Sequence, residues 1–292
     1  MKKETPSRVV FNIFNYAFLA LIAVISIYPF LYSLSISLSS AAEAARAGLH
    51  LYPKDISFTA FEMVLRNKSI YTGYMNTIFR TVVGTALSII MTSLAAYPLS
   101  RNYCPGKKFF SMMIIFTMLF SGGLIPSYLL MSNLHLLNTR LVYVLPGMIS
   151  AFNMIVIKNF FQSLPESLPE AARIDGASEL RILFRIVMPL SKPVLATVTL
   201  WVAVGHWNAW FDAMIYINSE SKQVLQTFLQ RIVIENSTQL IEQGLVNPDL
   251  LDYTPETIKA ATIMITILPI LCLYPFLQKY FAKGIMLGSV KG

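Results

Sequence analysis

A charged island interrupts the apolar sequence: Ser167-Leu-Pro-Glu-Ala-Ala-Arg-Ile-Asp-Gly-Ala-Ser178, followed by Ile186-Val-Met-Pro189. The apolar run on each side of this island is long enough to cross a bilayer, which takes about 20 mainly apolar residues. A polar helical segment held at a membrane surface between two spans, with Ala and Gly at close-approach positions, is suited to docking a soluble partner.

The composition of the 292-residue chain excludes a soluble domain. Apolar residues make up 55% and charged residues 13%, against roughly a quarter charged residues in an ordinary soluble domain. Because the first apolar run is much longer than the core of a signal peptide, we expect it to remain as an uncleaved span. The sequence predicts an all-α membrane protein with six spans, near 9–37, 74–99, 109–131, 141–160, 193–217 and 260–280.

The distribution of Lys and Arg predicts the orientation, because cytoplasmic loops are enriched in these residues. The termini and loops of one side carry fourteen basic and five acidic residues, whereas the loops of the other side carry seven basic and nine acidic residues. Both termini and the loop around Glu170 are therefore expected in the cytoplasm. The same topology explains the net charge of +8, and no basic-aromatic patch indicates a nucleic-acid partner.

The chain is expected to divide into three parts. Residues 1–70 form the first span and an outer loop, and residues 71–283 form a core of five spans with a cytoplasmic loop at 161–192. Residues 284–292 are a small, basic cytoplasmic tail. The two cysteines and the histidines have no metal-ligand spacing, so no metal site is expected.

Two helices are expected inside the cytoplasmic loop. Ser163-Leu-Pro-Glu166 and Ser167-Leu-Pro-Glu170 each have the capping-box pattern, in which the Ser and Glu side chains satisfy backbone N–H groups. A helix should therefore start at Ser167 and break near Gly176, a residue that tolerates the left-handed conformation. A second helix should run from Ser178 to Met188, where Pro189 stops it.

The spacing of the island resembles the coupling-loop motif of bacterial ABC importer permeases. It has Glu170-Ala-Ala, three residues, Gly176, nine residues, Ile186, two residues and Pro189. Asp175-Gly176-Ala177 is also typical of carbohydrate permeases. Met188 stands where the motif commonly has Leu, a swap that conserves volume.

The resemblance covers residue 71 to the end and points to the maltose-type second permease of type I importers. It is carried by Tyr74-Met-Asn-Thr77, Ala95-Ala-Tyr-Pro-Leu-Ser-Arg101, Trp207-Asn-Ala-Trp210 and Lys283-Gly-Ile-Met-Leu-Gly-Ser-Val-Lys-Gly292. The outer segment Glu242-Gln-Gly-Leu-Val-Asn-Pro248 looks closest to permeases for acidic or complex oligosaccharides, such as alginate importers.

The resemblance implies a permease subunit of the bacterial inner membrane that translocates an oligosaccharide by alternating access. Its implied partners are a similar second permease, two copies of a cytoplasmic ATPase that hold ATP and Mg²⁺, an extracytoplasmic sugar-binding protein and membrane lipid. This chain itself would bind no cofactor. The residues implied in coupling to the ATPase are Glu170, Ala171, Ala172, Arg173, Asp175, Gly176, Ala177, Arg181 and Pro189.

The fifth span carries candidate residues for a sugar pathway, because aromatic faces stack on sugar rings and amides bond hydroxyl groups. Helical spacing places Trp201, Asn208 and Asp212 on one stripe, with Trp207 and Trp210 elsewhere. Alternatively, Trp207 and Trp210 lie at the outer interface and Asp212 pairs with a neighbouring subunit. Arg80 in the second span either snorkels to the outer surface or attracts an acidic substrate.

The sequence lacks the motifs of an enzyme. No Gly-x-x-x-x-Gly-Lys-Ser/Thr loop is present for ATP phosphates, and no catalytic residues are assigned. An ion-coupled secondary transporter is one alternative, but it would show internal repeats and ionisable residues near mid-membrane. A non-transporting membrane scaffold is another, and it would leave the charged island as a mere connector.

Overall fold

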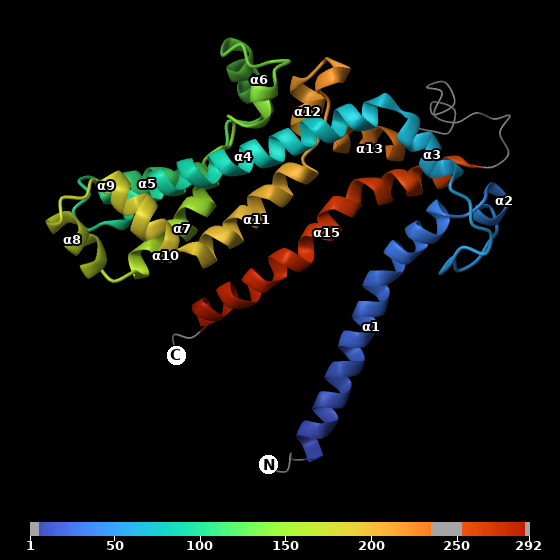
Figure 1. The fold of residues 1–292 in the computed structure, drawn as a ribbon, viewed down its shortest axis with the longest axis horizontal. Coiled ribbons are helices and arrows are strands. Elements are labelled where there is room, and N and C mark those ends of the chain that lie inside the picture. The colour runs from blue at the N-terminus through green and yellow to red at the C-terminus, as the bar shows by residue number, and fades with distance from the viewer. Residues whose placement is uncertain (1–5, 235–252, 290–292) are drawn as a thin grey trace. The chain divides into compact units, whose positions relative to one another are not determined.

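Helices make up the regular structure of residues 6–234 and 253–289, the part of the chain that this computed structural model describes (Figure 1). Within that part, an isolated antiparallel bridge joins Ser39 to Ile56. In chain order the elements are α1 Pro6–Ser37, α2 Ala41–Ala44, α3 Thr59–Arg66, α4 Lys68–Ser100, α5 Lys107–Leu119, α6 Leu124–Asn133, η1 Arg140–Tyr143, α7 Ala151–Ser163, α8 Ser167–Ile174, α9 Glu179–Ile182, η2 Leu183–Val187, α10 Met188–Leu190, α11 Lys192–Asn208, α12 Phe211–Tyr216, η3 Glu220–Lys222, α13 Leu225–Ile234 and α15 Pro255–Ser289.

The chain forms two compact units, residues 1–70 with 229–268 and residues 71–228 with 269–292. A unit boundary falls at the predicted end of the N-terminal part, although residues 229–268 also belong to the first unit. The predicted core of 71–283 stays a prediction. Residues 284–289, which we expected to be a tail, continue α15, and the outer segment 242–248 lies outside the described residues.

Three helices of the described chain are long and apolar enough to cross a membrane, namely Ser7–Ser37, Lys68–Ser100 and Pro255–Cys272. Two bent pairs raise the number to five if each pair is one span: α5 with α6, bent by 115°, and the helical segment Glu179–Leu190 with α11, bent by 87°. The first bend follows from Gly123, whose φ of 87° is open to glycine but strained for other residues.

The fourth predicted span, 141–160, is not one continuous helix. Its helical part is α7, whose 13 residues extend about 20 Å. The segment before it contains Pro146, which lacks an N–H group, and Gly147, whose φ is +70°. The helix begins only after Ser150, whose hydroxyl accepts a hydrogen bond from the Asn153 N–H at 3.5 Å.

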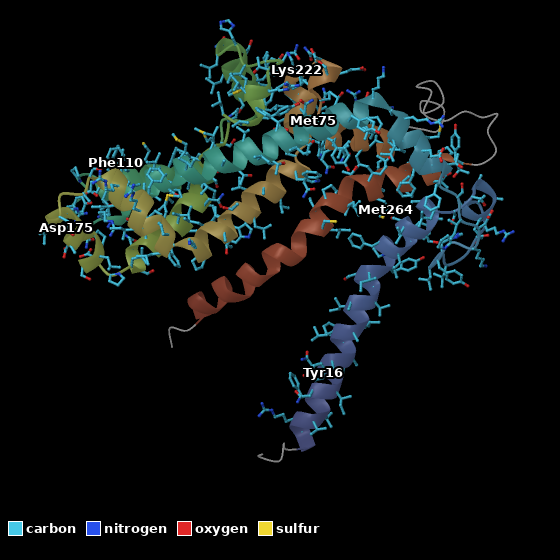
Figure 2. All side chains as sticks on the ribbon, viewed as in Figure 1. Tyr16, Met75, Phe110, Asp175, Lys222 and Met264 are labelled. Carbon is cyan, nitrogen blue, oxygen red and sulfur yellow. The ribbon has the colours of Figure 1, made fainter. Side chains whose placement is uncertain are left out.

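Within the second unit, α4 contributes to two separate apolar cores. Near its C-terminal end, Ala96, Tyr97 and Leu99 pack with buried residues of α7, α9, η2 and α11. Nearer its N-terminal end, Phe79 and Val83 pack against a cluster built by α6, η1, α12 and the segment after α12. Figure 2 labels Asp175 and Lys222 at opposite ends of this unit.

The side chain of His206 on α11 packs closely against α4 at Gly84. A Cβ atom added there would lie 2.6 Å from Nε2 of His206, which is far inside van der Waals contact. On α11, by contrast, a Cβ atom added at Gly205 meets nothing within 4 Å. The absence of a side chain at Gly84 therefore lets the His206 ring lie directly against α4.

Replacing Gly84 with Ala should destabilise the protein by about 1–3 kcal/mol, because His206 must leave its position to make room for the methyl group. Gly205→Ala is the matched control, since it adds the same methyl group to a helix without a clash. Thermal unfolding of the detergent-solubilised chain measures both. Equal unfolding temperatures for the two variants would contradict this account of the helix contact.

Candidate functional site

The helix α8 forms where the sequence predicted it, but without the expected capping boxes. The Ser163 hydroxyl donates to the Phe160 carbonyl at 2.7 Å, and no side-chain hydrogen bond caps the start of α8. The cause is local backbone geometry: Glu166 already has helical dihedral angles, φ −65° and ψ −27°. The Glu170 N–H donates to the Glu166 carbonyl at 3.2 Å, so the backbone satisfies its own groups there.

The predicted end of α8 at Gly176 is confirmed. Gly176 has a φ of +77°, and its N–H donates to the Arg173 carbonyl at 2.9 Å. The Ala177 N–H donates to the Ala172 carbonyl, also at 2.9 Å. These two bonds are the Schellman motif, which satisfies carbonyls that a helix end would otherwise leave open.

Much of α8 is open to solvent. Ile174 is 88% exposed, and Leu168 is also exposed, although both are apolar. Among the described residues, the carboxylate of the exposed Glu170 makes no hydrogen bond or ion pair. Sequence reasoning missed Ile174 as a surface residue, because an isoleucine in a helix is expected to face a core.

The second helical segment of the loop starts at Ser178, as predicted, but continues beyond Pro189. The Ser178 hydroxyl accepts from the Arg181 N–H at 3.4 Å. The helix passes through a π-helical turn, η2, and reaches Leu190 in α10. Pro189 lacks an N–H group for the carbonyls of the preceding turn, and the helix ends one residue after it, at Leu190, before the bend into α11.

Four side chains, which we call the Glu179 cluster, join the loop to the end of α4: Tyr97, Tyr103, Arg173 and Glu179. Oε1 of Glu179 accepts from Nε of Arg173 at 2.7 Å. Its Oε2 accepts from the hydroxyls of Tyr97 at 2.7 Å and Tyr103 at 3.1 Å. The Arg173 guanidinium also lies over the Tyr103 ring, 4.6 Å from its centroid. The sequence analysis selected only Arg173 from this cluster, because the other three are far from it in sequence or outside the motif.

Tyr103 is a stable hydrogen-bond donor within the cluster. Burial raises the pKa of the Tyr103 hydroxyl, and the hydrogen bond to Glu179 raises this pKa further. The phenol therefore keeps its proton at neutral pH and donates it to the carboxylate. Its oxygen simultaneously accepts from the Arg173 guanidinium.

The predicted stripe of Trp201, Asn208 and Asp212 does not exist as one helical face. The helix α11 ends at Asn208, Ala209 has extended dihedral angles, and Asp212 belongs to the separate helix α12. The assumption of one uninterrupted helix was therefore wrong.

The three tryptophans have different surroundings. Trp201 is exposed beside Phe152, with ring centroids 5.9 Å apart. Trp207 is buried and its ring meets the edge of the Tyr74 ring at 6.3 Å. Trp210 packs against Phe211 at 5.8 Å. Of the predicted pathway residues on α11, Trp201 and Asn208 are the exposed ones.

Arg80 and Asp212 form a bidentate ion pair within this chain. Nη1 and Nη2 of Arg80 donate to Oδ1 and Oδ2 of Asp212 at 3.1 and 2.6 Å. The Arg80 side chain is 2% exposed and that of Asp212 28% exposed. The interpretation that Arg80 snorkels outward is therefore wrong, and Asp212 has an ion-pair partner within its own chain.

The surroundings of Arg80 hold the guanidinium in place. Its Nη1 also donates to the Ala209 carbonyl at 3.1 Å, so it bonds the backbone at the break between α11 and α12. The guanidinium carbon lies 4.7 Å from the centroid of the Tyr143 ring. The Tyr143 hydroxyl donates in turn to the Lys222 carbonyl at 2.8 Å. The ion pair thus helps to fix the non-helical backbone at Ala209, between α11 and α12.

A neighbouring amide network fastens the segment after α12 to α4. Nδ2 of Asn76 donates to the carbonyls of Ser221 at 3.0 Å and Gln223 at 2.8 Å, and its Oδ1 accepts from Nε of Arg140 at 2.9 Å. The Thr77 hydroxyl accepts from the Leu225 N–H at 2.9 Å. These bonds make the N-terminal part of α4 the support for residues 221–225.

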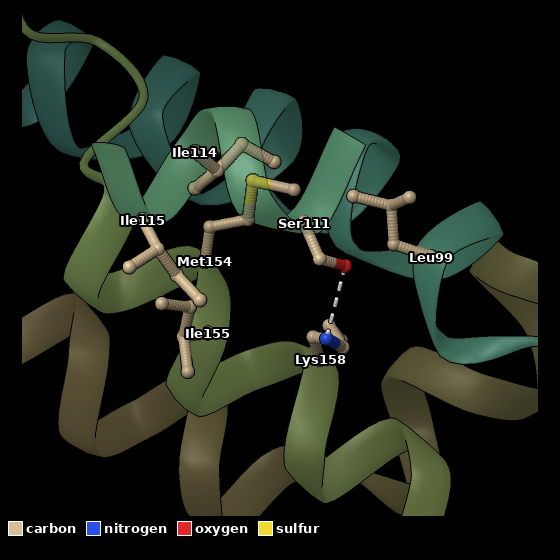
Figure 3. A pocket seen from close by; sticks show the side chains of 7 residues that line it. All are labelled: Leu99, Ser111, Ile114, Ile115, Met154, Ile155 and Lys158. Atoms are coloured by element: carbon tan, nitrogen blue, oxygen red, sulfur yellow. Dashed lines mark hydrogen bonds between the residues drawn. The ribbon is translucent and has the colours of Figure 1, made fainter. Parts of the chain in front are cut away.

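A small pocket opens between the end of α4, α5 and α7 (Figure 3). Its one charged lining group is Lys158, whose ammonium donates to the Ser111 hydroxyl at 3.3 Å. The remaining lining is apolar, formed by Leu99, Ile114, Ile115, Met154 and Ile155. No group of three His, Cys, Asp or Glu residues in the described chain could hold a metal ion.

Several apolar helices joined by polar loops, one of which projects a short exposed helix, define a helical membrane protein with a surface segment. The family model described as "Binding-protein-dependent transport system inner membrane component" matches residues 70–287. The chain therefore belongs to this family of inner-membrane permease subunits.

Similar proteins cover nearly the whole chain. Protein LplC of Bacillus subtilis (strain 168) is 44% identical over 99% of this chain and 97% of its own length. The polygalacturonan/rhamnogalacturonan transport system permease protein YtcP of the same organism is 41% identical over 97% of this chain and 98% of its own length. A chain in the crystal structure of a bacterial ABC transporter that imports the acidic polysaccharide alginate is 38% identical, with a TM-score of 0.89, over 96% of this chain and 100% of that chain.

Asp212→Ala should destabilise the protein by about 2–4 kcal/mol, because it leaves the buried Arg80 guanidinium without its counter-ion. The double variant Arg80→Met with Asp212→Leu removes both charges. Its free energy of unfolding should fall by less than that of Asp212→Ala alone. Thermal unfolding of the solubilised chain measures the three proteins.

The pair Arg66 and Glu62 provides the matched control for this prediction. Their atoms Nη2 and Oε2 are 3.8 Å apart and both side chains are exposed. Glu62→Ala should therefore change the stability by less than about 1 kcal/mol. If Glu62→Ala and Asp212→Ala had equal effects, the buried pair would not support the fold as described.

Proposed function

We propose that the chain is the transmembrane permease subunit of an ATP-driven ABC importer that moves an oligosaccharide across the bacterial cytoplasmic membrane by alternating access. The observation that carries the proposal is the exposure of α8, a short helix that ends in a Schellman motif and leaves Ile174 88% exposed, inside a chain that belongs to a transport family. An exposed apolar side chain on a short rigid helix is suited to insertion into a partner's groove.

The partner of α8 would be a cytoplasmic ATPase, present in two copies that supply ATP and Mg²⁺. Contact would involve the exposed residues of α8 and its end, namely Glu170, Ala171, Asp175 and Gly176, while the half-buried Ala172 and Ala177 pack α8 against the permease. Arg181, which is exposed, would face the same partner, and Pro189 would shape the return to α11.

The dimensions of α4 support this topology. Arg80 and Tyr97 are 17 residues apart on one helix, which corresponds to about 26 Å, close to the ~30 Å thickness of the hydrocarbon core. Polar networks at the two ends of that distance fit two membrane surfaces. In the proposed orientation α8 and both termini lie in the cytoplasm, as the excess of Lys and Arg on that side predicts.

The remaining partners would be a second permease and an extracytoplasmic binding protein that delivers the sugar. The family description names binding-protein-dependent transport. Because five or six helices seldom enclose a pathway alone, a second permease would complete it. This arrangement requires no ATP site in the chain itself.

The substrate would be an oligosaccharide from an acidic polysaccharide. The similar YtcP is named for polygalacturonan and rhamnogalacturonan, and the similar solved transporter imports alginate. In this chain the exposed Trp201 and Asn208 are suited to stacking on and bonding a sugar, together with Trp210. Arg80, Asp212 and Trp207 would instead hold the pathway's shape, since the structure engages each of them within the protein.

Co-purification of the tagged chain from its native membrane tests this function. The chain should recover a second permease and an ATPase, whose activity rises when galacturonate or alginate oligosaccharides are added with their binding protein. Recovery of the chain alone, without ATPase activity, would reject the proposal in favour of an ion-coupled transporter or a non-transporting scaffold.

Gly176→Val should abolish ATP-driven uptake while leaving the complex assembled. The position has a φ of +77° and an added Cβ would meet nothing within 4 Å, so the main effect of the substitution is backbone strain at the end of α8. Uptake of labelled oligosaccharide and recovery of the ATPase with the tagged chain measure the two effects.

Two control variants separate coupling from general strain. Gly147→Val has the same kind of strain, with a φ of +70° and open space, at a site outside α8. Gly176→Asn keeps a residue that tolerates the left-handed conformation. Both should retain most of the uptake. Full uptake by Gly176→Val would contradict a rigid role for α8.

A further inference from the structure

The Glu179 cluster joins three separate segments through one carboxylate. The three donors come from α4 (Tyr97), from the segment after α4 (Tyr103) and from α8 (Arg173). Glu179 itself begins α9, so its backbone position is fixed by the Ser178 cap. A change in the position of any of these segments has to break a hydrogen bond to Glu179.

A second contact holds the opposite end of α8. Nδ2 of Asn102 donates to Oε1 of Glu166, the residue that precedes α8, at 2.6 Å. Nζ of Lys107 lies 3.5 Å from Oδ1 of Asn102 and orients its amide. Adjacent residues, Asn102 and Tyr103, thus contact the two ends of the same helix.

The helix α8 needs such contacts because it cannot hold its own position. It has eight residues, far below the length at which an isolated helix is stable in water. Pro169 is its one buried residue, so apolar packing contributes little. Exposed ion pairs are individually weak, and Arg173 and Glu179 are 30% and 48% exposed. The cluster gains its strength from three donors that share one acceptor group.

We propose that Glu179 is a positioning residue that, through Arg173, Tyr97 and Tyr103, locks α8 to the cytoplasmic end of α4, so that a displacement of α8 moves α4 with it. The role in transmission rests on the proposed function, whereas the lock itself does not. In this arrangement the push of an ATPase on α8 reaches the membrane through the longest helix of the second unit.

A cross-linking rate measures the lock in membranes without any partner. Asn102→Cys and Glu166→Cys are combined with Cys104→Ser and Cys272→Ser, and a short bifunctional thiol reagent is added. These substitutions remove the Asn102 contact, so the Glu179 cluster becomes the remaining polar contact that joins α8 to α4 and the segment after it. Adding Glu179→Gln should slow cross-linking about five-fold, since the amide cannot accept all three bonds with the strength of a carboxylate.

Two further variants keep this experiment interpretable. Tyr103→Phe removes one donor and keeps the ring, and should slow cross-linking about two-fold. Arg185→Gln is the control: it neutralises an exposed charge of the same loop that makes no ion pair in the described chain, and its rate should equal that of the parent. A parent-like rate in Glu179→Gln would overturn the lock.

The second arm tests transmission in the co-purified complex with otherwise native chains. Glu179→Gln should leave ATPase recovery and the basal ATPase rate unchanged, while the stimulation by galacturonate oligosaccharides with their binding protein falls about five-fold or more. Normal stimulation together with slowed cross-linking would overturn the positioning role. If the native chain recovers no ATPase, the proposed function fails and transmission with it, while the cross-linking rate still decides whether Glu179 holds α8.

Discussion

The constraint on which the rest of the second unit depends is the continuity of α4. Its 33 residues extend about 50 Å without a break, although Pro98 lies inside the last turns. Between residues 101 and 228 the other long segments are interrupted, by Gly123, by the Pro146-Gly147 pair or by the extended Ala209. Those interruptions leave backbone groups and short helices that need external partners. The side chains of α4 provide them, from Asn76 and Arg80 near one end to Tyr97 at the other.

The two polar networks on α4 solve different physical problems. The Arg80 guanidinium is nearly removed from solvent and Asp212 is 28% exposed, so the buried cation would be unfavourable without its carboxylate partner on α12. The Glu179 cluster lies at the surface, where water competes for each bond. A buried pair suits a part that must keep its shape, and an exposed network suits a part that rearranges at low cost.

Sequence patterns predicted the features that depend on local chemistry. The apolar runs gave the positions of the long helices, and Gly176 gave the end of α8, since both follow from residues close together in the chain. The patterns failed where the position of a side chain depends on a partner that is distant in the sequence. Arg80 was expected to reach the surface because its partner lies 132 positions away. Glu179 was overlooked for the same reason: its donors Tyr97 and Tyr103 belong to another helix and the segment after it. The predicted capping boxes do not form, because the backbone of Glu166 has helical dihedral angles and the helical turn begins before Ser167.

The chemistry of α8 indicates a segment folded for an assembly. A helix at the surface of a self-sufficient protein directs apolar side chains inward and leaves charges in water. In α8 the charged Arg173 is bonded to its own chain, while Ile174 beside it is almost fully exposed. That arrangement costs free energy in isolation, because apolar surface remains hydrated. In the proposed assembly a partner would cover Ile174, and the hydrogen bonds of Arg173 to its own chain would connect that partner to α4.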